Sequence, residues 1–156
     1  MDTPLRILVA EDKLDDVLFL RRAFAKAGVN APIYFARDGG EVMNYLQGNP
    51  PFENPVEFPL PNLLLLDLKL PCVSGFQVLE WLRAQPGLSR LLVVVFSASG
   101  DSEDVTHAYA LGANAYIIKP HDPDELVRIV QRLQNYWLNI RAEPDQVLPS
   151  PALMAV

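Results

Sequence analysis

A run of four leucines, Leu63 to Leu66, is the sequence feature that most constrains the fold of this chain. A short continuous apolar run bounded by turn-forming residues such as Pro61 and Pro71 is typical of a strand buried on both faces of a parallel sheet. Asp67 follows the run directly, so a carboxylate stands at the carboxyl end of that strand. Because ligands bind at this edge of open α/β sheets, we expect Asp67 to lie in the functional site.

Four more short apolar runs share this character, at about residues 5–10, 32–36, 91–96 and 115–118. Each of the five runs precedes a segment whose apolar residues recur every three or four positions, the spacing of a helix packed on a core. These helices are predicted to begin near Leu14, Asp38, Ser74, Gly100 and Asp122. The alternation predicts an α/β protein with a flavodoxin-like, doubly wound fold: five parallel strands in the order 2-1-3-4-5, with helices on both faces.

The predicted domain spans residues 5–140, and a chain of 156 residues can bury a core of that size. Residues 141–156 mix prolines with small apolar side chains, which indicates a flexible C-terminal tail and leaves no length for a second domain. The segment from Gly48 to Pro61 holds five prolines and is predicted to be a loop. A variable surface excursion is favoured over a binding loop, and both hypotheses stay open.

The charge balance argues against some partners. The chain has 19 acidic and 13 basic residues, for a net charge of −6, whereas nucleic acids and anionic membranes attract basic surfaces. The single cysteine, Cys72, excludes an internal disulfide and fits a reducing compartment. Neither a signal-peptide core nor an apolar run of about 18 residues is present. We therefore expect a cytoplasmic protein that does not bind membranes or nucleic acid.

Polar residues stand at the ends of four predicted strands: Glu11 and Asp12, Asp67, Ser97, and Lys119. Neighbouring parallel strands end at the same edge of a sheet, so these side chains should converge on one site. Three carboxylates close together repel one another, which favours a bound divalent cation, and carboxylate oxygens suit Mg²⁺ best. No histidine or cysteine spacing suggests zinc or iron.

This set of residues predicts a phosphoryl acceptor. Lys119, at the end of a buried strand, is suited to pair with an anion on Asp67, and Ser97 offers a hydroxyl to the same anion. A carboxylate oxygen of Asp67 would attack phosphorus while Mg²⁺ holds the phosphoryl oxygens, which gives an aspartyl phosphate.

With these residues in this order, the chain resembles the receiver domain of two-component response regulators, the CheY-like family, over residues 5 to 138. The resemblance implies that Asp67 is the phospho-accepting aspartate and Lys119 the phosphate-binding lysine. It implies a Mg²⁺ site made by Asp12, Asp67 and the backbone carbonyl of Lys69, with Glu11 orienting a metal-bound water. The matching residues are Glu11-Asp12, Asp67 in Leu-Leu-Asp-Leu-Lys-Leu-Pro, Gly75, Ser97-Ala98, and Gly112 to Pro120.

The family's switch is implied for Ser97 and Tyr116: the ring of Tyr116 would move when the Ser97 hydroxyl swings toward the phosphoryl group. Two residues depart from the commonest pattern. Ser97 stands where threonine is more frequent, so the switch lacks a methyl group. Lys69, two positions past the acceptor, brings a long cationic side chain to the site. A residue at this position would affect how fast water reaches the acyl phosphate, and so how long the acyl phosphate lasts.

A finer resemblance is to small regulators paired with bacterial and cyanobacterial phytochromes. It rests on Tyr109 to Tyr116, the proline-rich loop, and Tyr136-Trp137-Leu138. It implies phosphorylation by a sensor histidine kinase of the phytochrome type, and a homodimer through the face of the fourth helix, fifth strand and fifth helix. The downstream partner is not readable from the sequence. The apolar residues Tyr136, Trp137, Leu138 and Ile140 fit either core packing or a partner surface, and both remain open.

Two enzyme or carrier functions compete with this interpretation. An aspartate-dependent phosphatase usually needs a second acid two residues after the nucleophile, where this chain has Lys69. A flavin carrier needs a Ser/Thr/Gly-rich phosphate loop after the first strand, whereas residues 11–16 are mostly acidic and would repel phosphate. His107 and His121 have no suitable partners for a hydrolase triad. We expect a signalling protein, with at most slow self-dephosphorylation, rather than an enzyme.

Overall fold

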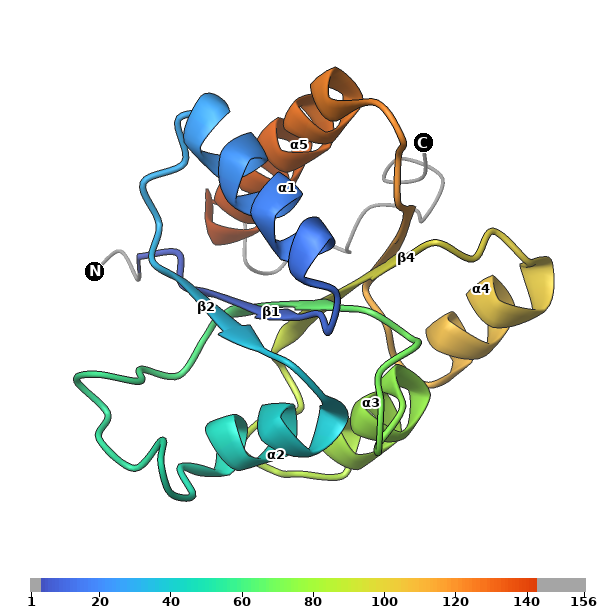
Figure 1. Cartoon of the computed structure of the whole chain (residues 1–156). Coiled ribbons are helices and arrows are strands. Elements are labelled where there is room, and N and C mark those ends of the chain that lie inside the picture. The colour runs from blue at the N-terminus through green and yellow to red at the C-terminus, as the bar shows by residue number, and fades with distance from the viewer. Residues whose placement is uncertain (1–3, 143–156) are drawn as a thin grey trace.

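A computed structural model of the chain describes residues 4–142, with side chains described for residues 4–137. Its five strands form one parallel sheet in the order β2-β1-β3-β4-β5, which confirms the predicted fold (Figure 1). Strand and helix ends lie within about three residues of the predicted ones, except that the last helix is longer. The elements are β1 (Ile7–Ala10), α1 (Leu14–Lys26), β2 (Ile33–Ala36), α2 (Gly39–Gln47), β3 (Leu63–Leu66), α3 (Gly75–Arg83), β4 (Leu92–Ser97), α4 (Ser102–Ala110), β5 (Ala115–Ile118) and α5 (Pro123–Ala142).

The sheet has a helical layer on each face. Helices α1 and α5 cover one face, and α2 and α3 cover the other, with α4 beside α3 (Figure 1). Leu63 and Leu65 of β3 pack into the cluster beneath α1 and α5, whereas Leu64 and Leu66 pack into the cluster beneath α2 and α3. Successive side chains of a strand point to opposite faces, so both faces of β3 must be apolar, as the leucine run predicts.

The register of the central strands aligns their carboxyl ends. Leu66 of β3 is paired with Ala10 of β1 on one side and with Val95 of β4 on the other. Glu11 and Asp67 therefore follow their strands at the same level of the sheet. This alignment places the polar residues that follow β1 and β3 side by side at one edge.

The proline-rich segment between α2 and β3 is a loop, as predicted. Its aromatic residues Phe52 and Phe58 pack against Tyr45 of α2, with ring centroids 5.1 and 6.0 Å from that of Tyr45. The Tyr45 hydroxyl donates a hydrogen bond to the carbonyl of Pro59 at 2.9 Å. The loop leads into the amino end of β3, so it lies at the edge of the sheet opposite Asp67.

Helix α5 extends through Ala142, two residues into the predicted tail. The side chains of Tyr136 and Trp137 are only 6% and 8% exposed and belong to the cluster beneath α1 and α5. Core packing is therefore the correct interpretation for these two residues. The side chains of Leu138 and Ile140, and the rest of the predicted tail from 143 to 156, lie outside the described residues. Within the described part of the chain, no helix is both long and apolar enough to cross a membrane.

Candidate functional site

Asp67 lies at the end of β3 with only 5% of its surface exposed. Both of its carboxylate oxygens are held: Oδ1 accepts from the backbone N–H of Lys69 at 3.2 Å, and Oδ2 accepts from Nζ of Lys119 at 2.9 Å. The start of α3 packs directly against it, because a Cβ on Gly75 would lie 2.2 Å from the Asp67 carbonyl oxygen. Glycine at position 75 is therefore required for the close approach of helix and strand.

Lys119, which follows β5, brings one cation to three carboxylates. Its ammonium group donates to Glu11, to Asp67 at 2.9 Å and to Asp16 at 3.0 Å. Burial by itself would lower the pKa of Lys119, but the hydrogen bonds to Glu11, Asp67 and Asp16 outweigh it and raise that pKa above its ordinary value. The lysine therefore stays protonated, and it neutralises part of the charge of this edge.

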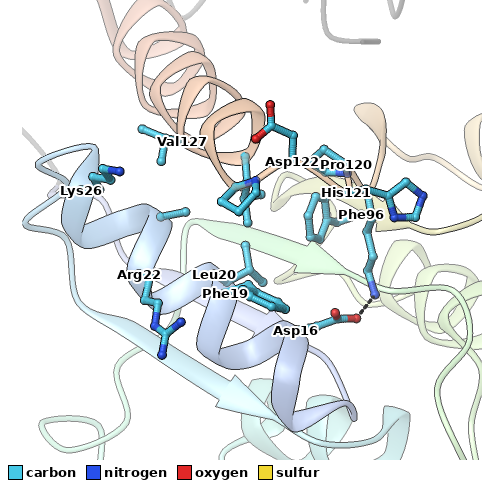
Figure 2. Close-up of a pocket in the computed structure, with 14 residues that line it drawn as sticks. Asp16, Phe19, Leu20, Arg22, Lys26, Phe96, Pro120, His121, Asp122 and Val127 are labelled. Atoms are coloured by element: carbon cyan, nitrogen blue, oxygen red, sulfur yellow. Dashed lines mark hydrogen bonds and ion pairs between the residues drawn. The ribbon is translucent and has the colours of Figure 1, made fainter.

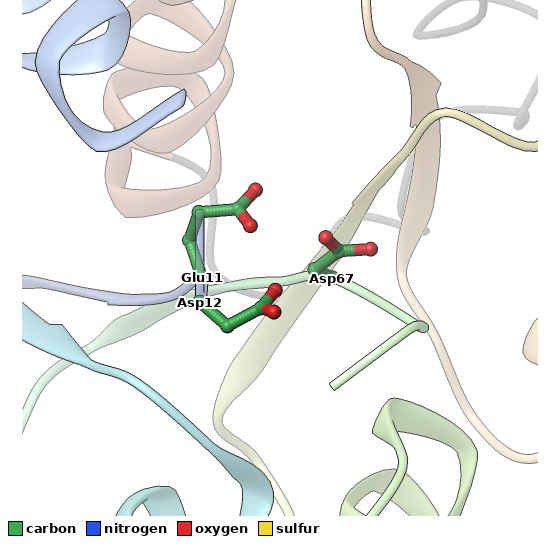
Figure 3. Close-up of side chains that lie close together, drawn as sticks. All are labelled: Glu11, Asp12 and Asp67. Carbon is green, nitrogen blue, oxygen red and sulfur yellow. The ribbon is translucent and has the colours of Figure 1, made fainter. Parts of the chain in front are cut away.

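Three acidic side chains lie close together at the ends of β1 and β3 (Figure 3). Glu11, Asp12 and Asp67 each offer an oxygen, and these oxygens all lie within 4.8 Å of one another. Trans ligands of an octahedral Mg²⁺ lie about 4.2 Å apart, since each bond is about 2.1 Å, so the three carboxylates could share one such ion after small side-chain adjustments. Burial, together with the nearby charge of Asp67, raises the pKa of Glu11 to about 7 although Lys119 opposes this. A divalent cation would relieve the repulsion that remains.

The predicted switch residues meet at the loop after β4. Ser97, the last residue of β4, is fully buried, and its Oγ accepts a hydrogen bond from the N–H of Ser99 at 3.2 Å. Tyr116 of β5 is 3% exposed and donates its hydroxyl to the carbonyl of Ser99 at 2.7 Å. Ser99 Oγ in turn donates to Asp104 of α4 at 2.6 Å. The end of β4 is thus connected to α4 through Ser99.

A pocket of about 530 Å³ opens beside the site, between α1 and the segment that leads from β5 into α5 (Figure 2). Its wall includes Phe19, which is 47% exposed, as well as His121 and Asp122. Asp16 and Lys119 also line it, so the pocket reaches the ion pair at the end of β5.

Of the five residues predicted to converge, the structure brings Glu11, Asp12, Asp67 and Lys119 together. The Ser97 hydroxyl instead accepts a hydrogen bond from the N–H of Ser99, and its approach to Asp67 stays a prediction. The Lys69 side chain is exposed, and the role of its carbonyl as a metal ligand stays a prediction. Sequence reasoning missed Asp16 and Ser99. The position of Asp16, in the first turn of the helix that follows Glu11-Asp12, was the one available indication that a further acid stands close to this edge.

Comparisons with known proteins agree with this geometry. Residues 7–131 match the family described as the response regulator receiver domain. The chain is 34% identical over 135 residues to response regulator Rcp1 of Synechocystis sp., an alignment that covers 86% of this chain and 90% of that protein. It also resembles the crystal structure of the phosphorylated cyanobacterial phytochrome response regulator RcpA, with a TM-score of 0.80, 34% identity, and 95% of this chain and 100% of that chain covered.

A second similar structure is the Mn²⁺-bound form of response regulator Rcp1, with a TM-score of 0.77 and 33% identity, covering 94% of this chain and 100% of that one. The matched family spans most of the chain, and the relative matches at more than 30% identity over nearly its whole length. Proteins of this family are signalling proteins of two-component systems. The chain belongs to the response regulator receiver domain family.

Proposed function

We propose that the protein is a cytoplasmic response regulator that accepts a phosphoryl group on Asp67 from a sensor histidine kinase, in a Mg²⁺-dependent reaction. The observation that carries this proposal is the contact between Lys119 Nζ and Asp67 Oδ2 at 2.9 Å, within a group of acids at one sheet edge. A buried carboxylate that is held by a cation and flanked by candidate metal ligands has the parts that phosphoryl transfer requires.

In the proposed reaction an oxygen of Asp67 attacks phosphorus, and the bond between phosphorus and the donor's imidazole nitrogen breaks. The electron pair of that bond leaves with the imidazole. The N–H of Lys69 and the ammonium of Lys119 orient the Asp67 carboxylate and reduce repulsion between two anions. Bound Mg²⁺ would be held by Asp12, Asp67 and the Lys69 carbonyl, with Glu11 beside them, and would supply charge neutralisation at the phosphoryl oxygens. The Mn²⁺-bound structure of the related Rcp1 supports this metal site.

We further propose that Ser97 and Tyr116 form the switch. When the Ser97 hydroxyl moves to the phosphoryl group, it loses the hydrogen bond that it accepts from the N–H of Ser99. The carbonyl of Ser99 also accepts the hydrogen bond of the Tyr116 hydroxyl, so the two switch residues are connected through Ser99. A change at Ser99 would reach α4 through its bond to Asp104. The face made of α4, β5 and α5 would then change its affinity for a downstream partner or for a second copy of this chain. Ile118 of β5 is 39% exposed and is one apolar residue that such a contact would cover.

The donor kinase is proposed to be of the phytochrome type, because a structure at 34% identity is named a cyanobacterial phytochrome response regulator. A panel of purified histidine kinases that includes a phytochrome-type kinase tests this choice. Fastest phosphotransfer from the phytochrome-type kinase is expected. Faster transfer from an unrelated kinase would contradict the choice of donor and leave the role of Asp67 intact.

The acceptor is tested with acetyl phosphate and Mg²⁺, which need no kinase. Intact-mass analysis should detect one added phosphoryl group on the wild-type chain, lost slowly on standing, and none on Asp67→Asn. Glu57→Gln is the control, because Glu57 is exposed and lies in the loop that leads into the amino end of β3, away from Asp67 at the carboxyl end. Equal labelling of wild type and Asp67→Asn, or no dependence on Mg²⁺, would contradict the proposal.

A further inference from the structure

Asp16, in the first turn of α1, is a third carboxylate on Lys119 that the proposed reaction does not use. Its Oδ2 accepts from Lys119 Nζ at 3.0 Å, the contact drawn as a dashed line in Figure 2. A lysine ammonium has three N–H donors, and here Glu11, Asp16 and Asp67 occupy all three. Lys119 therefore has no donor left for an additional anion.

Once phosphorylated, Asp67 is an acyl phosphate without a carboxylate charge, so the phosphoryl oxygens take over the N–H that Asp67 held and compete with Glu11 and Asp16 for the other two. These two carboxylates differ in burial: the side chains of Glu11 and Asp16 are 1% and 30% exposed. A buried carboxylate that loses its cation stays unsolvated, which is costly, whereas an accessible one is hydrated instead. Asp16 lines the open pocket between α1 and α5, so water can replace its bond to Lys119 (Figure 2).

We infer that Asp16 is a positioning residue for Lys119: it holds the ammonium group toward Asp67 before phosphorylation and releases it to the phosphoryl group afterwards. This inference rests on the proposed function of Asp67 as the phosphoryl acceptor. Asp16 and the phosphoryl group compete for one N–H donor of Lys119. Asp16 thereby limits how tightly the phosphorylated state is held.

The inference is tested on the full chain by titrating beryllofluoride, a phosphoryl mimic, in the presence of Mg²⁺. Removing the competing charge in Asp16→Asn should tighten beryllofluoride binding by about three- to tenfold, the range expected for loss of a partly exposed ion pair. Asp15→Asn is the matched control: Asp15 is exposed, it is the neighbouring residue, and the net charge changes equally. Its affinity should change less than about twofold. Asp16→Glu, which keeps the carboxylate, should return the affinity toward that of wild type.

A second measurement separates positioning from a structural effect. In nitrogen-15 NMR of the unphosphorylated chain, the ammonium protons of Lys119 should exchange with water faster in Asp16→Asn than in wild type or Asp15→Asn. If wild type binds beryllofluoride but Asp16→Asn binds no more tightly than Asp15→Asn, the inference is overturned and the proposed function stands. If wild type itself does not bind beryllofluoride, the proposed function is overturned and this inference falls with it.

Discussion

Replacing Lys119 with methionine removes the cation on which the acidic edge of the sheet depends. Methionine keeps most of the length and apolar volume of the side chain, so the change is mainly one of charge. Glu11 and Asp67, whose side chains are 1% and 6% exposed, lose their cation, whereas Asp16 is accessible enough to be hydrated. Breaking a buried ion pair by removing one partner costs about 3–5 kcal/mol, and we expect a loss of that size at pH 8 without metal.

The loss should depend on pH in a defined direction. The pKa of Glu11 is already raised to about 7 by burial, so this carboxyl is largely neutral at pH 5.5 and has little need of a cation. We expect the destabilisation by Lys119→Met to fall to roughly half at pH 5.5. Added Mg²⁺ should offset part of the loss at pH 8, since a divalent cation near Glu11, Asp12 and Asp67 replaces the missing charge.

Urea unfolding followed by tryptophan fluorescence measures both effects. Lys69→Met is the matched control, because Lys69 is exposed and close in sequence to Asp67, and surface substitutions of this kind change stability by about 0.5 kcal/mol or less. An equal loss for Lys119→Met and Lys69→Met would refute the assigned electrostatics. So would a Lys119→Met loss that is the same at pH 5.5 and pH 8.

Three further predictions follow from single contacts. Without metal, the pKa of Glu11 in the folded chain is raised from 4.5 to about 7, so the folded state binds a proton here more tightly than the unfolded state does. The stability that this proton contributes is fully present below pH 4.5 and is lost as the pH rises through about 7. At about 1.4 kcal/mol per pKa unit this is roughly 3 kcal/mol, and Glu11→Gln should flatten that part of a stability profile measured by urea unfolding; an unchanged slope would contradict it. Tyr116→Phe loses the bond to the Ser99 carbonyl and should cost about 1 kcal/mol while reducing the beryllofluoride-induced change in amide exchange of α4; a full response in the variant would argue against the switch. Gly75→Ala places a Cβ 2.2 Å from the Asp67 carbonyl, so it should lower stability by roughly 1–3 kcal/mol in thermal unfolding and slow labelling by acetyl phosphate; wild-type behaviour in both assays would contradict the required close approach.

The fold and the gathering of acidic residues with Lys119 at one end of the sheet could be predicted because both depend on short-range patterns. The run from Leu63 to Leu66 is typical of a strand covered on both faces, and its side chains divide between the two helical layers as such a strand requires. Parallel strands end at a common edge, so Asp67, Glu11 and Lys119 were expected to meet although they are far apart in the sequence. No side-chain detail was needed for either prediction.

The packing of the helices was beyond reach of the sequence. From the sequence, the apolar residues Tyr136 and Trp137 fit a core or a partner surface equally well. Only the way α5 packs against the sheet shows that they belong to the core. Ser99 lies in a loop with no periodic pattern, so its hydrogen bonds to Tyr116 and Asp104 could not be anticipated.

The sequence by itself determined which segments form strands, and therefore which polar residues stand together at their carboxyl ends, because burial on two faces leaves an unmistakable apolar run. Only the tertiary structure decided that Asp16 shares the ammonium group of Lys119 while its neighbour Asp15 remains exposed to solvent. The reason is geometric. Adjacent residues of a helix point about 100° apart, so the rotation of α1 about its axis against the sheet decides which of the two acids faces Lys119.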